Sequence, residues 1–168
     1  MPMGADLPER PAGAGAPRFA VWARQDPGTA EHPGTPLQHV QIVKGWIENG
    51  RPRERVYEVA GDPNNGASVD PGTCQTEGPG FSELCAVWTD PDFDPSQRAF
   101  YYARVIENPT CRWSAYVCNA HGVFCADPST ITEGLEPCCS PSHRWTIQER
   151  AWTSPIWYAP PRAPRPRP

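Results

Sequence analysis

The fold is decided by the stretch Leu37-Gln-His-Val-Gln-Ile-Val-Lys-Gly-Trp-Ile47 together with the returning stretch Arg53-Glu-Arg-Val-Tyr-Glu-Val-Ala60. Apolar side chains recur at every second position from Val40 to Trp46, which is the period of a β-strand, and only Lys44 interrupts that face. The Asn49-Gly50 pair between the two stretches suits a type I′ turn, because both central residues need positive φ. The sequence therefore predicts a β-hairpin over residues 37–60.

Further strands are predicted on both sides of this hairpin. The segments are short, contain β-branched and aromatic residues and end at turn residues, at 18–24, 83–89, 97–107 and 150–158. Pro155 cannot donate to a strand ladder, so the last segment is predicted to be an edge strand or to carry a bulge. Six such strands predict a mainly β fold: an antiparallel, sandwich-like module in two layers.

Length and composition bound the remaining possibilities. The 168 residues suit one domain, and 23 prolines with 14 glycines leave little room for long helices. No apolar run could span a membrane, the start lacks the pattern of a signal peptide, and a net charge of −4 argues against a nucleic-acid surface. We expect a linker over 1–17, a β-rich domain over 18–158 with a cysteine-rich insertion at 108–144, and a disordered Pro/Arg-rich tail over 159–168.

Aromatic residues are the expected core material. The sequence has seven tryptophans, and in a chain this rich in proline and glycine they are predicted to fill a sandwich core rather than to line a binding groove. They are Trp22, Trp46, Trp88, Trp113, Trp145, Trp152 and Trp157.

The cysteines favour disulfides, as in an exported protein, although reduced thiols in a cytosolic protein are an alternative. The seven candidates are Cys74, Cys85, Cys111, Cys118, Cys125, Cys138 and Cys139. Plausible pairs are Cys74–Cys85, Cys111–Cys118, and Cys125 with Cys138 or Cys139, but spacing alone leaves the connectivity open. An odd number of cysteines without an export signal fits a chain that has lost its N-terminal part.

The cysteine-rich insertion offers two candidate reactive sites. A zinc site needs four nitrogen or sulfur ligands, and the region offers Cys118, His121, Cys125, Cys138, Cys139 and His143, but their spacing matches no closed zinc pattern. Cys118 with His121 could form a nucleophile and base, but nothing marks a helix N-terminus or a third orienting residue. We therefore predict neither catalytic nor metal-binding residues in this chain.

Two further clusters have plain structural explanations. Asp90, Asp92 and Asp94 alternate and could bind Ca²⁺, but turn capping is favoured because prolines stiffen the segment and Pro95 stands where a calcium loop requires glycine. In the segment 149–155, Arg150 and Trp152 could contact a ligand, but an ion pair and a core tryptophan are the favoured interpretation.

Several longer segments together resemble one known family. They are Met1-Pro-Met-Gly-Ala-Asp-Leu7, Leu37 to Trp46, Val56-Tyr-Glu-Val-Ala60, Trp88-Thr-Asp-Pro-Asp-Phe-Asp-Pro95, Ala99-Phe-Tyr-Tyr-Ala-Arg-Val105 and Ile147-Gln-Glu-Arg-Ala-Trp-Thr-Ser-Pro-Ile-Trp157. The chain resembles the C-terminal region of the bacterial domain-of-unknown-function 3604 family, over most of residues 1–158.

The resemblance implies a partner and a location. The larger N-terminal part of that family resembles PHP-type metal-dependent phosphoesterases, which hold divalent metal at a site opened by a His-x-His pair. This sequence has no such pair, since its histidines are scattered singly at His32, His39, His121 and His143. The chain therefore looks like a C-terminal fragment of a periplasmic or extracellular protein, with a divalent metal expected only in the missing N-terminal part.

Two functions follow as expectations. The first is a non-catalytic accessory β domain whose partner is the N-terminal catalytic domain of the same protein, in which case one face should display an apolar patch of several hundred Å². The second is a free-standing secreted module that binds a glycan or a protein through exposed tryptophans.

Overall fold

An antiparallel sheet of five strands forms the centre of the computed structural model, which describes residues 2–11 and 13–161. The strand order is β10 (Arg150–Trp152), β7 (Ala99–Glu107), β2 (Leu37–Glu48) and β3 (Arg51–Gly61), and β11 (Ile156–Tyr158) also pairs with β7. The predicted hairpin is confirmed as β2 and β3. Asn49 and Gly50 have φ of 51° and 72° at its turn, as a type I′ turn requires.

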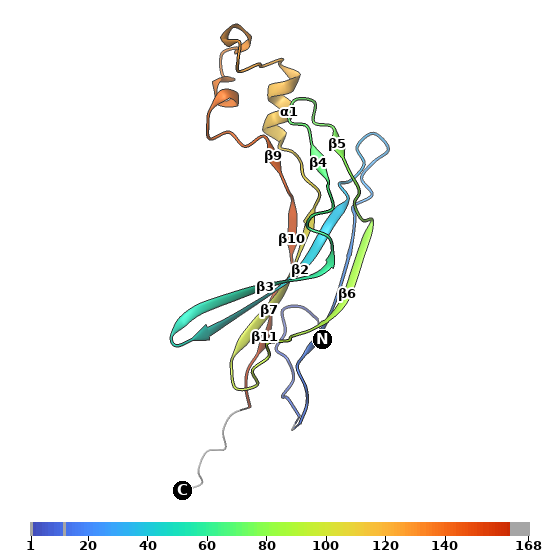
Figure 1. The fold of residues 1–168 in the computed structure, drawn as a ribbon, viewed down its shortest axis with the longest axis vertical. Coiled ribbons are helices and arrows are strands. Elements are labelled where there is room, and N and C mark those ends of the chain that lie inside the picture. The colour runs from blue at the N-terminus through green and yellow to red at the C-terminus, as the bar shows by residue number, and fades with distance from the viewer. Residues whose placement is uncertain (1, 12, 162–168) are drawn as a thin grey trace.

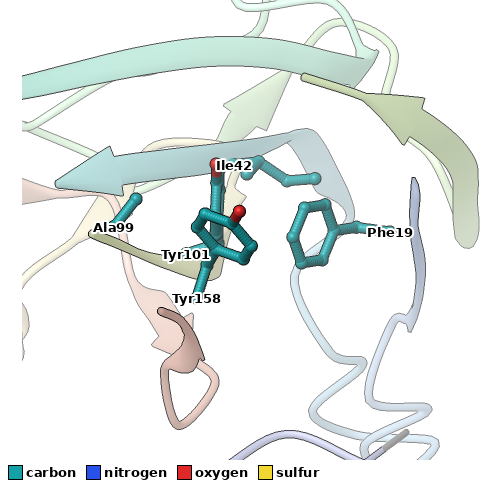
Figure 2. Packing of buried hydrophobic residues seen from close by; sticks show 5 residues of the cluster. All are labelled: Phe19, Ile42, Ala99, Tyr101 and Tyr158. Carbon is teal, nitrogen blue, oxygen red and sulfur yellow. The ribbon is translucent and has the colours of Figure 1, made fainter. Parts of the chain in front are cut away.

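A second layer of two antiparallel strands, β1 (Arg18–Arg24) and β6 (Glu83–Thr89), covers one face of this sheet. We call that face the inner face and the opposite one the outer face. Figure 2 shows Phe19 of β1 pointing toward Tyr101 of β7 and Ile42 of β2, and the two aromatic ring centroids lie 4.6 Å apart. The predicted mainly β, sandwich-like fold is confirmed.

The last predicted strand is broken where the proline stands, as expected. β10 ends at Trp152 and β11 begins at Ile156, and between them Thr153 donates its backbone N–H to Ala103 O at 3.0 Å. The N-terminal segment runs beside β11, since Leu7 N–H donates to Trp157 O at 2.7 Å. Part of the segment expected to be a linker is thus attached to the sheet, and residues 162–168 of the predicted tail lie outside the described residues.

Lys44, the residue that interrupts the apolar face of β2, is buried in an ion pair. Its Nζ lies 2.6 Å from Asp90 Oδ2, and both side chains are almost fully shielded from solvent. Nζ also donates to Asp92 O at 2.7 Å, and Tyr101 Oη donates to the same Asp90 oxygen at 2.7 Å. One carboxylate therefore joins the end of β6 to both central strands of the sheet.

Two of the three aspartates at the end of β6, Asp90 and Asp94, cap turns as predicted, whereas the Asp92 carboxylate bonds to side chains of β3. Asp90 Oδ1 accepts from Asp92 N–H at 2.9 Å, and Asp94 Oδ1 accepts from Ser96 N–H at 2.8 Å. Asp92 Oδ2 accepts from Tyr57 Oη at 2.8 Å and from Arg55 Nη1 at 2.6 Å, and these bonds hold the pKa of Asp92 below its usual value. Burial, and then the bond to Asp92, raise the pKa of Tyr57 to about 12.

A chain of side-chain amides holds the loop after β3 against the end of the sheet. Gln148 Nε2 donates to Gln38 Oε1 at 2.7 Å, Gln38 Nε2 donates to Asn65 Oδ1 at 3.1 Å, and Asn65 Nδ2 donates to Asn108 Oδ1 at 2.9 Å. Asn108 and Gln38 are buried. Four segments that are distant in sequence are thereby joined through satisfied polar groups.

Residues 108–147 form a separate lobe, hereafter the cysteine lobe, at one end of the molecule (Figure 1). It contains the helix α1 (Trp113–Ala120), two 3-10 turns, η1 (Pro128–Thr130) and η2 (Glu136–Cys139), and the strand pair β8 (Thr110–Cys111) and β9 (Thr146–Ile147). A second short pair, β4 (Ser68–Val69) and β5 (Thr76–Glu77), lies in the loop after β3. The core of the lobe is small and is built on Cys118, Val123 and Cys138.

Three disulfides are formed, with pairings that partly correct the sequence prediction. They are Cys74–Cys111, Cys118–Cys138 and Cys125–Cys139, and Cys85 is free. The Cys74–Cys85 pair is wrong because Cys85 lies on β6, where its side chain is exposed. The Cys111–Cys118 pair is wrong because Cys118 of α1 faces the core of the lobe and meets Cys138 there.

The tryptophans do not fill the core, which corrects the prediction. Four of the seven are about half or more exposed: Trp22 62%, Trp113 75%, Trp152 58% and Trp157 49%. The other three are only partly buried. The period of two explains this, because Trp157 lies between the inward-facing Ile156 and Tyr158. Phe19, Tyr101 and Tyr158 supply the fully buried rings of the core, and the partly buried Trp46 and Trp88 pack against them.

Among the residues that the structure describes, there is no helix with the length and apolarity needed to cross a membrane.

We predict that Lys44→Met lowers the free energy of unfolding by about 3–5 kcal/mol, because it leaves a buried carboxylate without its cation. Urea unfolding followed by circular dichroism measures the loss. Arg55→Met is the matched control: its ion pair with Asp92 is half exposed, so its loss should cost at most about 1 kcal/mol. Equal losses in the two variants would contradict the structural importance of the buried pair.

We also predict one reactive thiol per chain under denaturing, non-reducing conditions, and seven after reduction. Thiol titration with a chromogenic disulfide reagent gives both numbers. The variant Cys85→Ser should remove the single reactive thiol, and any residual thiol in that variant would show that a disulfide is missing.

Candidate functional site

The outer face of the five-stranded sheet carries an exposed patch of large apolar side chains. Trp152 and Trp157 lie on the short C-terminal strands, Val56 lies on β3, and Ile47 lies at the end of β2; all four are exposed. Strand alternation places the core residues Ile42 and Tyr101 on the inner face and the four exposed side chains on the outer face. The four exposed side chains therefore cannot contribute to the core between the layers. An exposed apolar sheet face of this kind is typical of an interaction surface.

An aromatic row crosses one end of the outer face. Trp157 pairs with Phe100, and their ring centroids lie 5.3 Å apart. Phe100 in turn pairs with Gly45, and its ring lies over this glycine, because a Cβ there would be 2.2 Å from Phe100 Cζ. A glycine is therefore required beneath the ring.

A pocket of about 620 Å³ opens beside the aromatic row. Its lining is mainly apolar, with Ile47, Phe100 and Trp157, while Arg53 and Arg98 stand among its charged groups. A volume of this size could hold an apolar side chain of a partner or a small cyclic ligand.

A row of polar groups crosses the outer face farther along the strands. The register places Trp152 beside Arg104, Arg104 beside Gln41, and Gln41 beside Glu58, one residue from each strand. Arg104 Nε donates to Gln41 Oε1 at 2.7 Å, and Gln41 Nε2 donates to Glu58 Oε1. The result is a continuous hydrogen-bonded line of guanidinium, amide and carboxylate that ends at an exposed indole.

His39 lies next to this polar row and is buried. Its Nε2 is 3.9 Å from Glu58 Oε2, and among the described residues its Nδ1 has no hydrogen-bond partner. Burial lowers the pKa of His39, and the positive charge of Arg104 acts in the same direction, while the nearby Glu58 opposes both. The imidazole is therefore neutral at pH 7.

The cysteines of the candidate zinc site and of the candidate nucleophile pair cannot bind zinc or act as a nucleophile. The sulfurs of Cys118 and Cys125 are bonded in two different disulfides, so neither can act as a thiolate. His143 joins two parts of the cysteine lobe, with Nε2 3.0 Å from Ser114 Oγ and Nδ1 3.0 Å from Cys138 O. Across residues 2–11 and 13–161, no group of three or more His, Cys, Asp or Glu side chains is placed to hold a metal ion.

The segment 149–155 also differs from its sequence interpretation. Trp152 is 58% exposed on the outer face rather than in the core, and Arg150 Nε donates to Gln148 O at 3.4 Å. Sequence reasoning missed the polar row altogether. Gln41 and Glu58 could be read only as polar positions on strands, because the register that brings them beside Arg104 is set by tertiary pairing.

Together, the fold and this surface define a class: a mainly β, disulfide-stapled module with an exposed aromatic sheet face. The chain belongs to the family described as "Protein of unknown function (DUF3604)", which matches residues 1–160. Comparison with the curated proteins and with the solved structures gives no match.

We predict a pH dependence of stability that originates at His39. The pKa of His39 is lower in the folded chain than its ordinary value of 6.5. At any pH between these two pKa values, the unfolded chain therefore binds more protons than the folded chain. The stability due to neutral His39 is therefore fully present above pH 6.5 and is lost as the pH falls through the folded pKa. Urea midpoints measured from pH 7.5 to pH 5 should fall more steeply for the native chain than for His39→Gln. Parallel curves would contradict this assignment.

Proposed function

We propose that this chain is a non-catalytic accessory β domain of a larger, metal-dependent phosphoesterase-like protein, and that its outer face packs against the catalytic part. The observation that carries the proposal is the exposed aromatic outer face. Burying Trp152, Trp157, Ile47 and Val56 against a second domain would remove the largest apolar groups of this face from water.

The pocket beside Phe100 supports a domain interface. Interfaces between domains owe much of their stability to a few aromatic or arginine anchors that fill pockets, surrounded by polar groups. Here Trp157 and Phe100 border a pocket flanked by Arg53 and Arg98. In this proposal the catalytic part supplies the divalent metal and its ligands, and this domain shapes the rim of the catalytic site.

The proposed location is the periplasm or the extracellular space. Three disulfides in 168 residues are consistent with an extracellular protein. The small core of the cysteine lobe supports this, because Cys118, Cys138 and their partners supply much of its packing and would lose it in a reducing compartment.

A second candidate function is glycan binding by the same face. The polar row favours it: an indole that can stack on the apolar face of a sugar stands beside a guanidinium, an amide and a carboxylate that can bind hydroxyl groups. In this alternative Trp152 contacts the ligand directly. Quenching of tryptophan fluorescence across a glycan panel, lost in Trp152→Ala, would favour this function over the first.

The first function predicts that the purified chain has no phosphatase activity with Mn²⁺, Zn²⁺ or Mg²⁺, and that it binds the separately produced N-terminal part of its parent protein. Binding should weaken about tenfold or more in Trp157→Glu, which places a charge in the interface. Trp113→Glu is the matched control, because Trp113 is even more exposed than Trp157, at 75% against 49%, but lies in the cysteine lobe.

Robust turnover by the isolated chain would reject the accessory role. Equal weakening by Trp157→Glu and Trp113→Glu would reject the outer face as the interface. An in-frame reading of the gene upstream of Met1 that encodes no paired histidines would reject the phosphoesterase-like parent.

A further inference from the structure

The second layer of the sandwich has an unpaired edge. Within residues 2–11 and 13–161, β1 pairs with β6 alone, and the interior of β1, from Phe19 to Ala23, has no charge, glycine or proline. Natural sheets usually protect such an edge with a charge, a proline or a bulge, and an unprotected apolar edge pairs readily with another extended segment. The edge strand β3 shows the usual protection, with Pro52 and several charged side chains.

The backbone groups that face this edge can be identified. Gln25 N–H donates to Ser82 O at 2.9 Å, and Gln25 faces Ser82 in the register of the two strands. Hydrogen-bonded positions alternate in an antiparallel pair, so Phe19, Val21 and Ala23 point their backbone groups toward β6. The N–H and C=O of Ala20 and Trp22 therefore point away from β6, and within the described residues they have no backbone partner.

A trough runs along the same edge. Its first hollow, of about 210 Å³, lies between Phe19–Trp22 of β1 and Tyr101–Ala103 of β7. Its second hollow, of about 270 Å³, continues from Ala23 and Arg24 of β1 to Val105 of β7 and Ala151 of β10. Each hollow has room for an aliphatic or aromatic side chain, since a cavity of 150 Å³ already accepts benzene.

The charges along the trough define the occupant. Arg18 is exposed and forms no ion pair among the described residues. It precedes Phe19, where the first hollow begins, and no acidic residue lines that hollow. At the other end, Arg24 and Arg150 share the second hollow with Glu107 and Glu149, so that end is balanced. A second copy of β1, paired antiparallel about Val21, would place Arg18 opposite Arg24, and these like charges disfavour self-pairing.

We propose that the free edge of β1 binds an extended polypeptide segment, which adds a third strand to this layer and runs antiparallel to β1. Apolar side chains at alternate positions of the segment fill the trough, and an acidic residue at its C-terminal end lies beside Arg18. Main-chain bonds to Ala20 and Trp22 hold the strand, and the apolar side chains select it. This interface is separate from the outer face, and it does not depend on the proposed function.

A synthetic peptide of the length of β1, 7 residues, tests the proposal. It carries aliphatic residues at its second, fourth and sixth positions, threonine at the other positions and glutamate at the last. With the peptide at about ten times its Kd, hydrogen exchange at the amides of Ala20 and Trp22 should slow about tenfold. A peptide that ends in lysine should bind more weakly.

Ala20→Pro removes the backbone donor that faces the trough while leaving the bonds between β1 and β6, so it should abolish binding. Val87→Pro is the matched control, because Val87 lies opposite Ala20 and its N–H points to the far edge of β6. Thermal unfolding verifies that both variants are folded.

Any of the following results would overturn the proposal. The first is no binding to the native chain at about 1 mM peptide. The second is equal binding to the Ala20→Pro and Val87→Pro variants, or equal binding of the glutamate and lysine peptides. The third is a dimer of the native chain that protects the same amides without peptide, which would make a second copy the occupant.

Discussion

The buried ion pair between Lys44 and Asp90 is the interaction on which the two-layer arrangement depends. Asp90 immediately follows β6, Lys44 lies in the middle of β2, and Tyr101 of β7 donates to the same carboxylate. A buried charge without its partner costs several kcal/mol, so arrangements that bury Lys44 or Asp90 alone are disfavoured. The second layer is thereby held at one position over the sheet, and the loop that follows β6 is held with it.

An open sandwich results, and it leaves two surfaces of the sheet uncovered. Two strands cover a sheet of five, so the inner face is only partly closed and the trough beside β1 remains. The outer face keeps its apolar groups exposed because period-two alternation leaves Trp152 and Trp157 on the side opposite the core. Both surfaces follow from the same topology. Buried Phe and Tyr rings form the centre of the inner core, and Trp152 and Trp157 remain exposed on the opposite face of the sheet.

Local chemistry was enough to predict most of the strands. The 18–24 and 83–89 segments and the turn at Asn49-Gly50 were readable because periodicity and turn residues act over a few neighbours. Long-range relations were not readable: Lys44 and Asp90 are 46 residues apart, and the partner of Cys74 lies 37 residues away. The site was missed for the same reason, since the polar row exists only once the register places Gln41 beside Arg104.

The family to which the chain belongs has no known function, so the role of this chain must be inferred from its surfaces, and the outer face is the one that we propose packs against a second domain. Hydroxyl-radical footprinting of the full-length parent, compared with this chain alone, tests that assignment most directly. If the outer face is buried in the parent, Trp152 and Trp157 will be oxidised in the isolated chain and protected in the parent, while Trp113 is oxidised equally in both. Equal oxidation of all three tryptophans in the two proteins would contradict the accessory-domain assignment.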